Sequence, residues 1–204
     1  MAADPPARRG RPALLDVEQV VDAAVAILDA EGLAAVSFRR LSSELGVSHM
    51  TLYGYFDSKD DLLEALVART IAVPAVRRSS SAPWDEVLLA VMLDIHRQLV
   101  SRPGIAELLV SRELTGEWVG QVREQLVDIL RNVGYGQRRA TDGISVLFNY
   151  LLGAAMIETH RGRGGSAASF RLGLRYLIAG LTADLPSQAP DRAPTSAPSR
   201  PRKA

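Results

Sequence analysis

The chain has 204 residues, of which 47% are hydrophobic, a length that predicts one or two domains. Its formal net charge is +1, so any surface for nucleic acid or membrane must be local. Cysteine is absent, which excludes a disulfide framework, a zinc–thiolate site and a cysteine nucleophile.

The sequence predicts a cytoplasmic protein without a membrane segment. Residues 1–12 are rich in proline and arginine, unlike the apolar run of a secretory signal. The longest apolar run, SVLFNYLLGAAMI, has about 13 residues and contains Asn149, whereas a membrane helix needs about 20.

Helical periodicity dominates the N-terminal part of the chain. Four helices are predicted there, at residues 16–31, 38–45, 47–56 and 58–73. Gly32 and Gly46 follow the first two and are expected to end them. Ser58, followed three residues later by Asp61, is a start signal for the fourth helix, which Pro74 ends or kinks.

The rest of the chain is also predicted to be helical, and no segment has the pattern of a strand. Five helices are expected, at residues 84–101, 104–112, 115–133, 138–161 and 167–184. The helix at 138–161 is apolar on nearly all sides, so other helices must cover it. Residues 186–204 contain five prolines and no large apolar residue, which predicts a disordered tail.

The second and third predicted helices have the spacing of a helix-turn-helix. The second ends at Gly46 and the third begins a few residues later, with Ser48 as its N-cap. In this motif the second helix enters the DNA major groove and its N-terminal residues reach base edges. His49, Met50 and Thr51 occupy those positions.

Two tyrosines follow the recognition residues. Tyr53 and Tyr55 carry hydroxyl groups that can bind phosphate while their rings pack on the scaffold. Residues 1–61 contain six basic and ten acidic side chains. DNA binding is therefore expected to depend on a few well-placed cations and on helix N-termini.

The segment RRLSSELGVSHMTLYGYFDSKDDLLEALV resembles the signature of the tetracycline-repressor (TetR) family. In that signature a helix-turn-helix ends in an aromatic LY-x-YF and is followed by a KxxLL helix. The resemblance covers residues 16–68. A fainter one, FRLGLRYLIAGL at 170–181, is similar to the final helix of members near the tetracycline repressor itself.

The resemblance implies an all-α fold in which a three-helix helix-turn-helix domain precedes a helical bundle for dimerisation and ligand binding. The expected divisions are a flexible basic arm at 1–15, the DNA-binding domain at 16–62, the bundle at 63–185 and the tail at 186–204. The residues expected to contact DNA are Arg39, Ser48, His49, Met50, Thr51, Tyr53, Tyr55 and Lys59.

The N-terminal arm contains the sequence RRGRP. Arg-Gly-Arg-Pro is the core of a short A·T-hook, in which arginines enter a narrow minor groove. Arg8, Arg9 and Arg11 are therefore further candidates for DNA contact. The alternative is an unordered arm whose arginines are merely solvated, and the sequence leaves both open.

A dimer is expected because two recognition helices read a palindrome far better than one. The last two helices would form a four-helix interface, with candidate residues Leu147, Leu151, Phe170, Leu174, Leu177 and Leu181. The resemblance also implies a cavity for a small, largely apolar effector. Candidate cavity residues are Trp84, Met92, His96, Trp118, Asn149, Tyr150 and Met156.

Three functions of different class follow from these features. The leading one is a homodimeric, ligand-responsive transcriptional regulator, a repressor that an effector releases from a palindromic operator. The alternative is a DNA-binding regulator without a small ligand, controlled by abundance or a protein partner. An enzyme is disfavoured because neither a GxSxG elbow nor a phosphate-binding loop is present. No cofactor, metal or membrane is expected.

Overall fold

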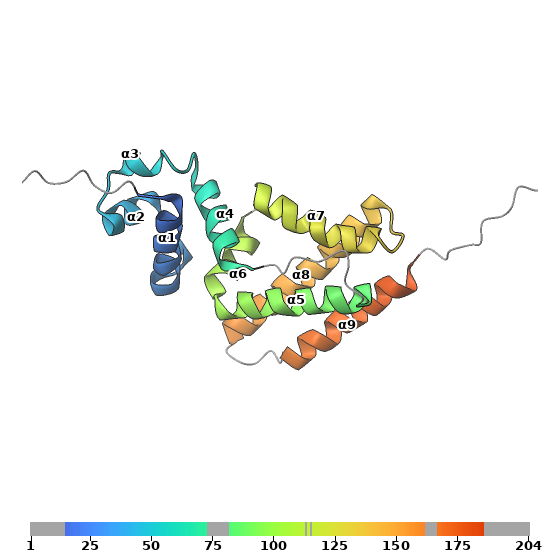
Figure 1. Ribbon diagram of the computed structural model, residues 1–204. Coiled ribbons are helices and arrows are strands. Elements are labelled where there is room, and N and C mark those ends of the chain that lie inside the picture. The colour runs from blue at the N-terminus through green and yellow to red at the C-terminus, as the bar shows by residue number, and fades with distance from the viewer. Residues whose placement is uncertain (1–14, 73–81, 113, 115, 162–166, 186–204) are drawn as a thin grey trace, which may run out of the picture.

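The computed structural model describes residues 15–72, 82–112, 114, 116–161 and 167–185. The predicted arm, with Arg8, Arg9 and Arg11, and the predicted tail lie outside these residues. The described part is all-α, as expected, and contains no strand (Figure 1). Its helices are α1 (Val17–Glu31), the 3₁₀ turn η1 (Leu33–Ala35), α2 (Phe38–Leu45), α3 (His49–Leu52), α4 (Lys59–Thr70), α5 (Trp84–Ser101), α6 (Pro103–Ser111), α7 (Glu117–Arg131), α8 (Gln137–Arg161) and α9 (Ala167–Ala183).

The first two helices begin and end at the residues that the sequence indicates. Asp16 caps α1 in a capping box with Gln19, which satisfies amide groups at the helix start. Ser37 caps α2 by accepting a hydrogen bond from the backbone of Arg40. Gly46 then adopts φ 64°, a left-handed conformation that costs glycine little, and turns the chain toward α3.

The third helix is shorter than predicted. The expected helix at 47–56 is reduced to His49–Leu52, and the chain then tightens into a turn. The amide of Gly54 donates to the carbonyl of Thr51 and that of Tyr55 to the carbonyl of Leu52, both three residues back. This turn brings Phe56, which is only 7% exposed, into the core. Burial of Phe56 therefore outweighs continuation of the helix.

Helix α4 joins the two halves of the molecule. Ser58 and Asp61 form the predicted capping box at its start. Its buried residues are Leu62, Leu63, Leu66 and Val67. The helix contacts α1 on one side and α7 on the other, so the predicted division between residues 62 and 63 falls inside a helix that belongs to both halves (Figure 1).

The second half is a bundle built around α8, which contacts α5, α6, α7 and α9. By length and composition alone, Gln137–His160 would suffice to cross a membrane, the only such segment among the described helices. The apolar run found in the sequence is shorter than this helix because polar residues interrupt the helix. Packing against four neighbours is the arrangement expected of a core helix in a bundle.

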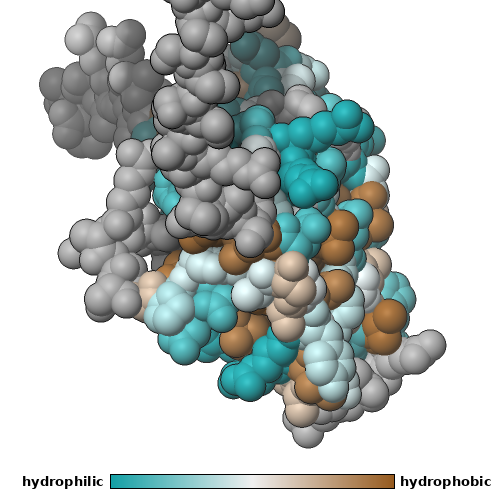
Figure 2. All heavy atoms as spheres, turned by 90° about the vertical axis from the view of Figure 1, so that its right-hand side faces the viewer, coloured by the Kyte–Doolittle hydropathy of each residue, from teal (hydrophilic) through white to brown (hydrophobic). Residues whose placement is uncertain are grey.

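The end of the bundle farthest from α1–α3 presents a mixed surface. In the part of this end that Figure 2 leaves uncovered by grey residues, hydrophobic residues are interspersed among hydrophilic ones. The largest exposed apolar side chains of the bundle lie on α6, α8 and α9 and are Val110, Val146, Ile157, Leu172 and Tyr176.

Candidate DNA-binding surface and ligand cavity

The start of α3 is an exposed helix end held by hydroxyl groups. The Oγ atom of Ser48 accepts a hydrogen bond of 3.1 Å from the backbone amide of Thr51. The hydroxyl groups of the same two residues lie 2.8 Å apart. Both side chains are exposed and retain lone pairs for a ligand. Ser48 is therefore first a helix cap, and Thr51 is fixed beside it.

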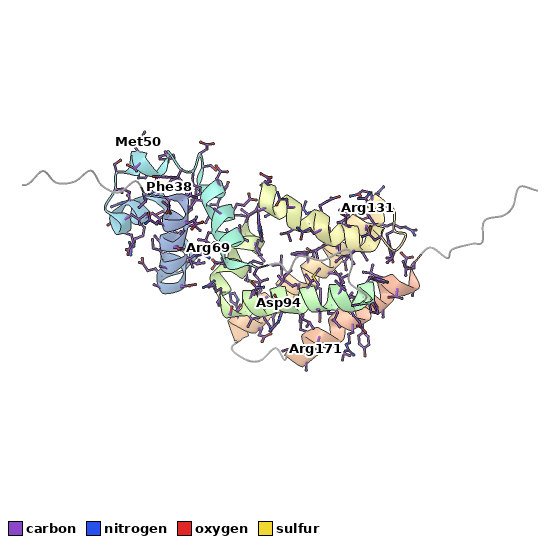
Figure 3. The ribbon with its side chains drawn as sticks, viewed as in Figure 1. Phe38, Met50, Arg69, Asp94, Arg131 and Arg171 are labelled. Atoms are coloured by element: carbon purple, nitrogen blue, oxygen red, sulfur yellow. The ribbon has the colours of Figure 1, made fainter. Side chains whose placement is uncertain are left out.

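Met50 is the most exposed large apolar side chain of the described residues, at 76%. Figure 3 shows it pointing away from the body of the molecule. Leu52, on the other face of the same short helix, is fully buried. An apolar tip displayed in this way suits contact with a thymine methyl group in the major groove.

The rings of Phe38, His49 and Tyr53 form a cluster between α2 and α3. Ring centroids lie 4.7 Å apart for Phe38 and Tyr53 and 5.3 Å apart for His49 and Tyr53. Phe38 is buried, whereas His49 and Tyr53 are exposed. Aromatic contacts at these distances are stabilising. They hold the His49 ring on the recognition helix.

Tyr55 has a different role from the one predicted. Its side chain is half-buried, and its hydroxyl group donates to the backbone carbonyl of Leu15. The hydroxyl hydrogen is therefore used within the domain and is not available to a phosphate oxygen. We correct the expected DNA contact to a scaffold role, in which Tyr55 fastens the start of α1 to the turn after α3.

Two cations near α3 are free of carboxylates within the described residues. Arg39 is exposed and Lys59 is half-buried at the first position of α4, and neither has an ion pair there. The neighbouring Arg40 instead pairs with Glu31 and Glu44 at 2.6 and 2.7 Å. These hydrogen bonds raise the pKa of Arg40 above its already high ordinary value. Arg39 and Lys59 remain available to bind phosphate.

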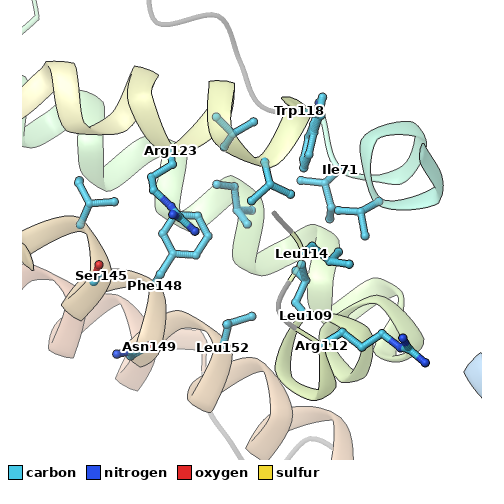
Figure 4. Close-up of a pocket in the computed structure, with 15 residues that line it drawn as sticks. Ile71, Leu109, Arg112, Leu114, Trp118, Arg123, Ser145, Phe148, Asn149 and Leu152 are labelled. Carbon is cyan, nitrogen blue, oxygen red and sulfur yellow. The ribbon is translucent and has the colours of Figure 1, made fainter. Parts of the chain in front are cut away.

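A cavity of about 370 Å³ lies between α4, α5, α6, α7 and α8 (Figure 4). Drug-sized ligands occupy pockets of roughly 300 to 1,000 Å³ that are mostly apolar with a few polar groups. The wall of this cavity is likewise mostly apolar with a few polar groups. Its lining residues are Val67, Ile71, Ile95, Leu109, Arg112, Leu114, Trp118, Val119, Val122, Arg123, Ile144, Ser145, Phe148, Asn149 and Leu152.

Two of the seven cavity residues predicted from the sequence line this cavity. Trp118 and Asn149 line it. The other five do not, because a helix turns only one face toward the cavity and hydrophobic periodicity does not tell which. The candidates that are wrong for this cavity are Trp84, Met92, His96, Tyr150 and Met156.

His96 belongs to the core between α5, α8 and α9. It is 3% exposed and stacks on Phe170 with ring centroids 3.8 Å apart. Its Nε2 atom has no hydrogen-bond partner and lies 3.6 Å from a carboxylate oxygen of Glu158. Burial lowers the pKa of His96, and the charge of Glu158 opposes this shift only in part. The imidazole is therefore neutral near pH 7.

Of the polar side chains that line the cavity, sequence reasoning named Asn149 and missed Arg112, Arg123 and Ser145. Ser145 and Asn149 are four residues apart on α8, and Arg123 lies on α7 across from them. Four-residue spacing places two side chains on one helix face, a signal that was available. Arg123 had no such signal, because an arginine on an amphipathic helix usually faces water.

Two polar contacts tie the cavity wall to α4. Arg112, which lines the cavity, pairs with Asp60 in the first turn of α4 at 2.5 Å. Glu64, in the middle of α4, accepts a hydrogen bond of 3.3 Å from the amide of Val119 in the first turn of α7. Carboxylates are favourable at helix N-termini. Movement of α6 or α7 would thus act directly on α4.

The predicted dimer interface needs correction. Leu147, Leu151, Phe170 and Leu174 are at most 4% exposed because they pack inside the single chain. A side chain buried in this way cannot form the surface that meets a partner. Leu177 and Leu181 are half-buried.

The apolar side chains that α8 and α9 do expose lie on other faces of these helices. They are Val146, Ile157, Leu172 and Tyr176, each 49% exposed or more. Beside them, Tyr150 lies against Gly173, where an added Cβ atom would meet the tyrosine hydroxyl at 2.0 Å. Gly173 therefore gives room to the Tyr150 side chain.

The family comparisons agree with both halves of this arrangement. The model of bacterial regulatory proteins of the tetR family matches residues 20–66, which include α2, α3 and most of α4. A model described as the tetracyclin repressor-like C-terminal domain matches residues 79–167. The chain belongs to the tetR family. As a member, it is a DNA-binding transcriptional regulator with a tetracycline-repressor-like C-terminal domain.

The proteins similar to this tetR-family chain include a transcriptional repressor and regulators whose structures were solved in complex with DNA or with a small molecule. The transcriptional repressor DrrR1 of Streptomyces coeruleorubidus is 29% identical over 160 residues, which are 75% of this chain and 57% of DrrR1. ActR of Streptomyces coelicolor, solved with actinorhodin, has a TM-score of 0.70 and 26% identity over 83% of this chain and 97% of ActR. BioQ, solved with its double-stranded DNA operator, has a TM-score of 0.66 and 28% identity over 83% of this chain and 99% of BioQ.

Proposed function

We propose that the protein is a homodimeric repressor that binds a palindromic operator and that a small molecule releases it from DNA. The observation that carries the proposal is the position of α4. This helix begins at Lys59 beside the recognition helix, and its other end supplies Val67 and Ile71 to the cavity wall. One rigid element thus joins the DNA-binding surface to a cavity of ligand size.

In the proposed complex, α3 enters the major groove. His49, Met50 and Thr51 face base edges, since all three are exposed at the start of this helix. Arg39 and Lys59 bind phosphate, because no carboxylate neutralises them within the described residues. The Tyr53 hydroxyl adds a further phosphate contact.

The homodimer part of the proposal is supported by the exposed apolar side chains of α8 and α9. Val146, Ile157, Leu172 and Tyr176 would lose contact with water in a two-fold interface. Two copies would then present two α3 helices to half-sites about 34 to 36 Å apart, one turn of DNA. Such a protein would act in the cytoplasm, and it needs no enzymatic activity, cofactor or metal.

Release by the effector requires two positions of α4. A ligand that fills the cavity shifts the equilibrium only as far as its affinity for the two positions differs. The Arg112–Asp60 pair and the Glu64–Val119 hydrogen bond transmit movement of α6 and α7 to α4. A typical coupling of about 1 to 3 kcal/mol weakens DNA binding by about 5- to 150-fold.

A reciprocal titration tests this proposal. Ligands found by thermal shift are titrated against the protein with and without its selected operator. The account expects operator DNA to weaken ligand binding by the same factor as the ligand weakens DNA binding. Equal ligand affinity with and without DNA would rule out a switch, and tighter binding with DNA would make the molecule a co-repressor.

The cavity also distinguishes the proposed function from its alternative, a regulator without a small ligand. That alternative predicts a filled bundle, whereas a cavity of about 370 Å³ is large enough for an effector. Val122→Trp, which places a large ring in the cavity, is the matched control. It should abolish ligand binding and leave operator binding without ligand intact.

A further inference from the structure

Among the described residues, the cavity wall carries positive charge and no negative charge. Of the 15 described residues that line it, two are arginines and none is aspartate or glutamate. The guanidinium of Arg112 is already paired with Asp60, and Figure 4 shows it directed away from the centre of the cavity. The cation that remains for a ligand is therefore Arg123.

Arg123 differs from the other arginines of α4–α7 and their caps. Each of the others has a carboxylate partner within the described residues. On α7 itself, Arg131 pairs with Asp128 at 3.0 Å. Arg123 has no such partner in the same part of the chain, although acidic residues are common there. Arg123 is exposed to solvent and also lines the cavity, and a charge there without a carboxylate partner among the described residues is suited to a ligand of opposite charge.

The polar and apolar parts of the wall are separated. Figure 4 shows Arg123 extending from α7 toward Phe148 on α8, with Ser145 and Asn149 on the same side of the cavity. Ser145 donates its hydroxyl hydrogen to the carbonyl of Thr141 at 2.9 Å, so toward a ligand it can only accept. Trp118, Leu109, Leu114 and Ile71 form the opposite, apolar side.

We propose that the effector is an amphipathic organic anion, with a flat apolar body between Trp118 and Phe148 and one carboxylate or similar acidic group at Arg123. A neutral body alone would remove water from the guanidinium without replacing its hydrogen bonds, which is costly. An anion replaces them with charge-assisted bonds in the paired geometry that arginine favours. A cation would be repelled. This inference rests on the proposed effector cavity and specifies its ligand class.

Two fluorescent probes with nearly the same apolar body test the charge requirement. One is 1-anilinonaphthalene-8-sulfonate, an anion, and the other is N-phenyl-1-naphthylamine, which lacks the sulfonate. Affinities are measured for the full chain and for the variants Arg123→Gln and Arg123→Lys. Arg131→Gln is the matched control on the same helix, and Val122→Trp tests whether a probe occupies the cavity.

The inference expects Arg123→Gln to weaken binding of the anionic probe about tenfold, with less than about a twofold effect on the neutral probe. Arg123→Lys should retain most of the anion affinity, and Arg131→Gln should change neither probe. Val122→Trp should abolish binding of both.

Equal losses for the two probes in Arg123→Gln, or no loss for either, would overturn the anion requirement and leave the cavity intact as an effector site. Failure of both probes to bind the unmodified chain, or binding that Val122→Trp does not affect, would overturn the cavity site itself and with it this inference.

Discussion

Replacing Gly116 by alanine tests the contact between α4 and α7. Gly116 is the N-cap of α7 and supplies no side-chain acceptor, so Glu64 of α4 takes that role through the amide of Val119. A Cβ atom at position 116 would lie 1.5 Å from Oε2 of Glu64. The backbone there, with φ −72° and ψ 179°, suits alanine. The substitution therefore displaces the Glu64 carboxylate without straining the backbone of position 116.

The effect of Gly116→Ala on the free energy of unfolding should depend on whether Glu64 is present. Moving the end of a flexible side chain costs little, but losing a helix cap costs about 1 kcal/mol. Glycine-to-alanine replacement at a compatible site stabilises by about 0.4 to 1 kcal/mol. In the natural chain the two terms nearly cancel. In a Glu64→Ala background only the gain remains, so the substitution stabilises by about 0.4 to 1 kcal/mol.

Urea unfolding of the natural chain, the two single variants and the double variant measures this difference. The four proteins are compared at one protein concentration, because the proposed dimerisation would make stability depend on concentration. The account predicts an interaction free energy of about 1 kcal/mol between positions 64 and 116. Equal stabilisation by Gly116→Ala in both backgrounds would show that Glu64 does not cap α7.

Three further predictions concern single side chains. Lys59→Ala should lower the salt slope of DNA binding by about 1 on all sequences alike; a loss on one sequence only would contradict a phosphate contact. Tyr55→Phe should cost about 0.5 to 1.5 kcal/mol of stability without altering that slope, as seen by urea unfolding and DNA titration. His96 has a folded-state pKa below its ordinary 6.5, so the stability it contributes is complete above pH 6.5 and is lost as pH falls toward the folded pKa. His96→Leu should flatten this loss between pH 7.5 and 5.5, and an unchanged pH profile would refute it.

Helix boundaries were predictable where local groups decide them. The caps at Asp16, Ser37 and Ser58 and the left-handed Gly46 act within a few residues, so the sequence contains their cause. The end of α3 depends instead on burial of Phe56 in a core made by distant segments. The prediction from hydrophobic periodicity made the third helix too long, because periodicity contains no information about this core.

The faces of the bundle helices were harder to predict for a related reason. Helix α8 is apolar on most sides, so its sequence does not tell which side meets α5, which lines the cavity and which is exposed. Leu147 therefore looked like an interface residue although it is fully buried, while the exposed Val146 beside it was passed over. Arg123 became recognisable only when the structure placed it at the cavity without a carboxylate partner among the described residues.

The central claim, that α3 reads a palindromic operator as part of a dimer, is tested most directly by selecting bound DNA from a random library. The natural chain and the variants Met50→Ala and Thr51→Ala are selected in parallel. The account predicts an inverted repeat with half-site centres about one helical turn apart. Each variant should relax preference at one symmetric pair of positions, by about 1 to 3 kcal/mol where a good contact is lost. A single unrepeated site, or variants that select the same sequence with unchanged preference, would contradict it.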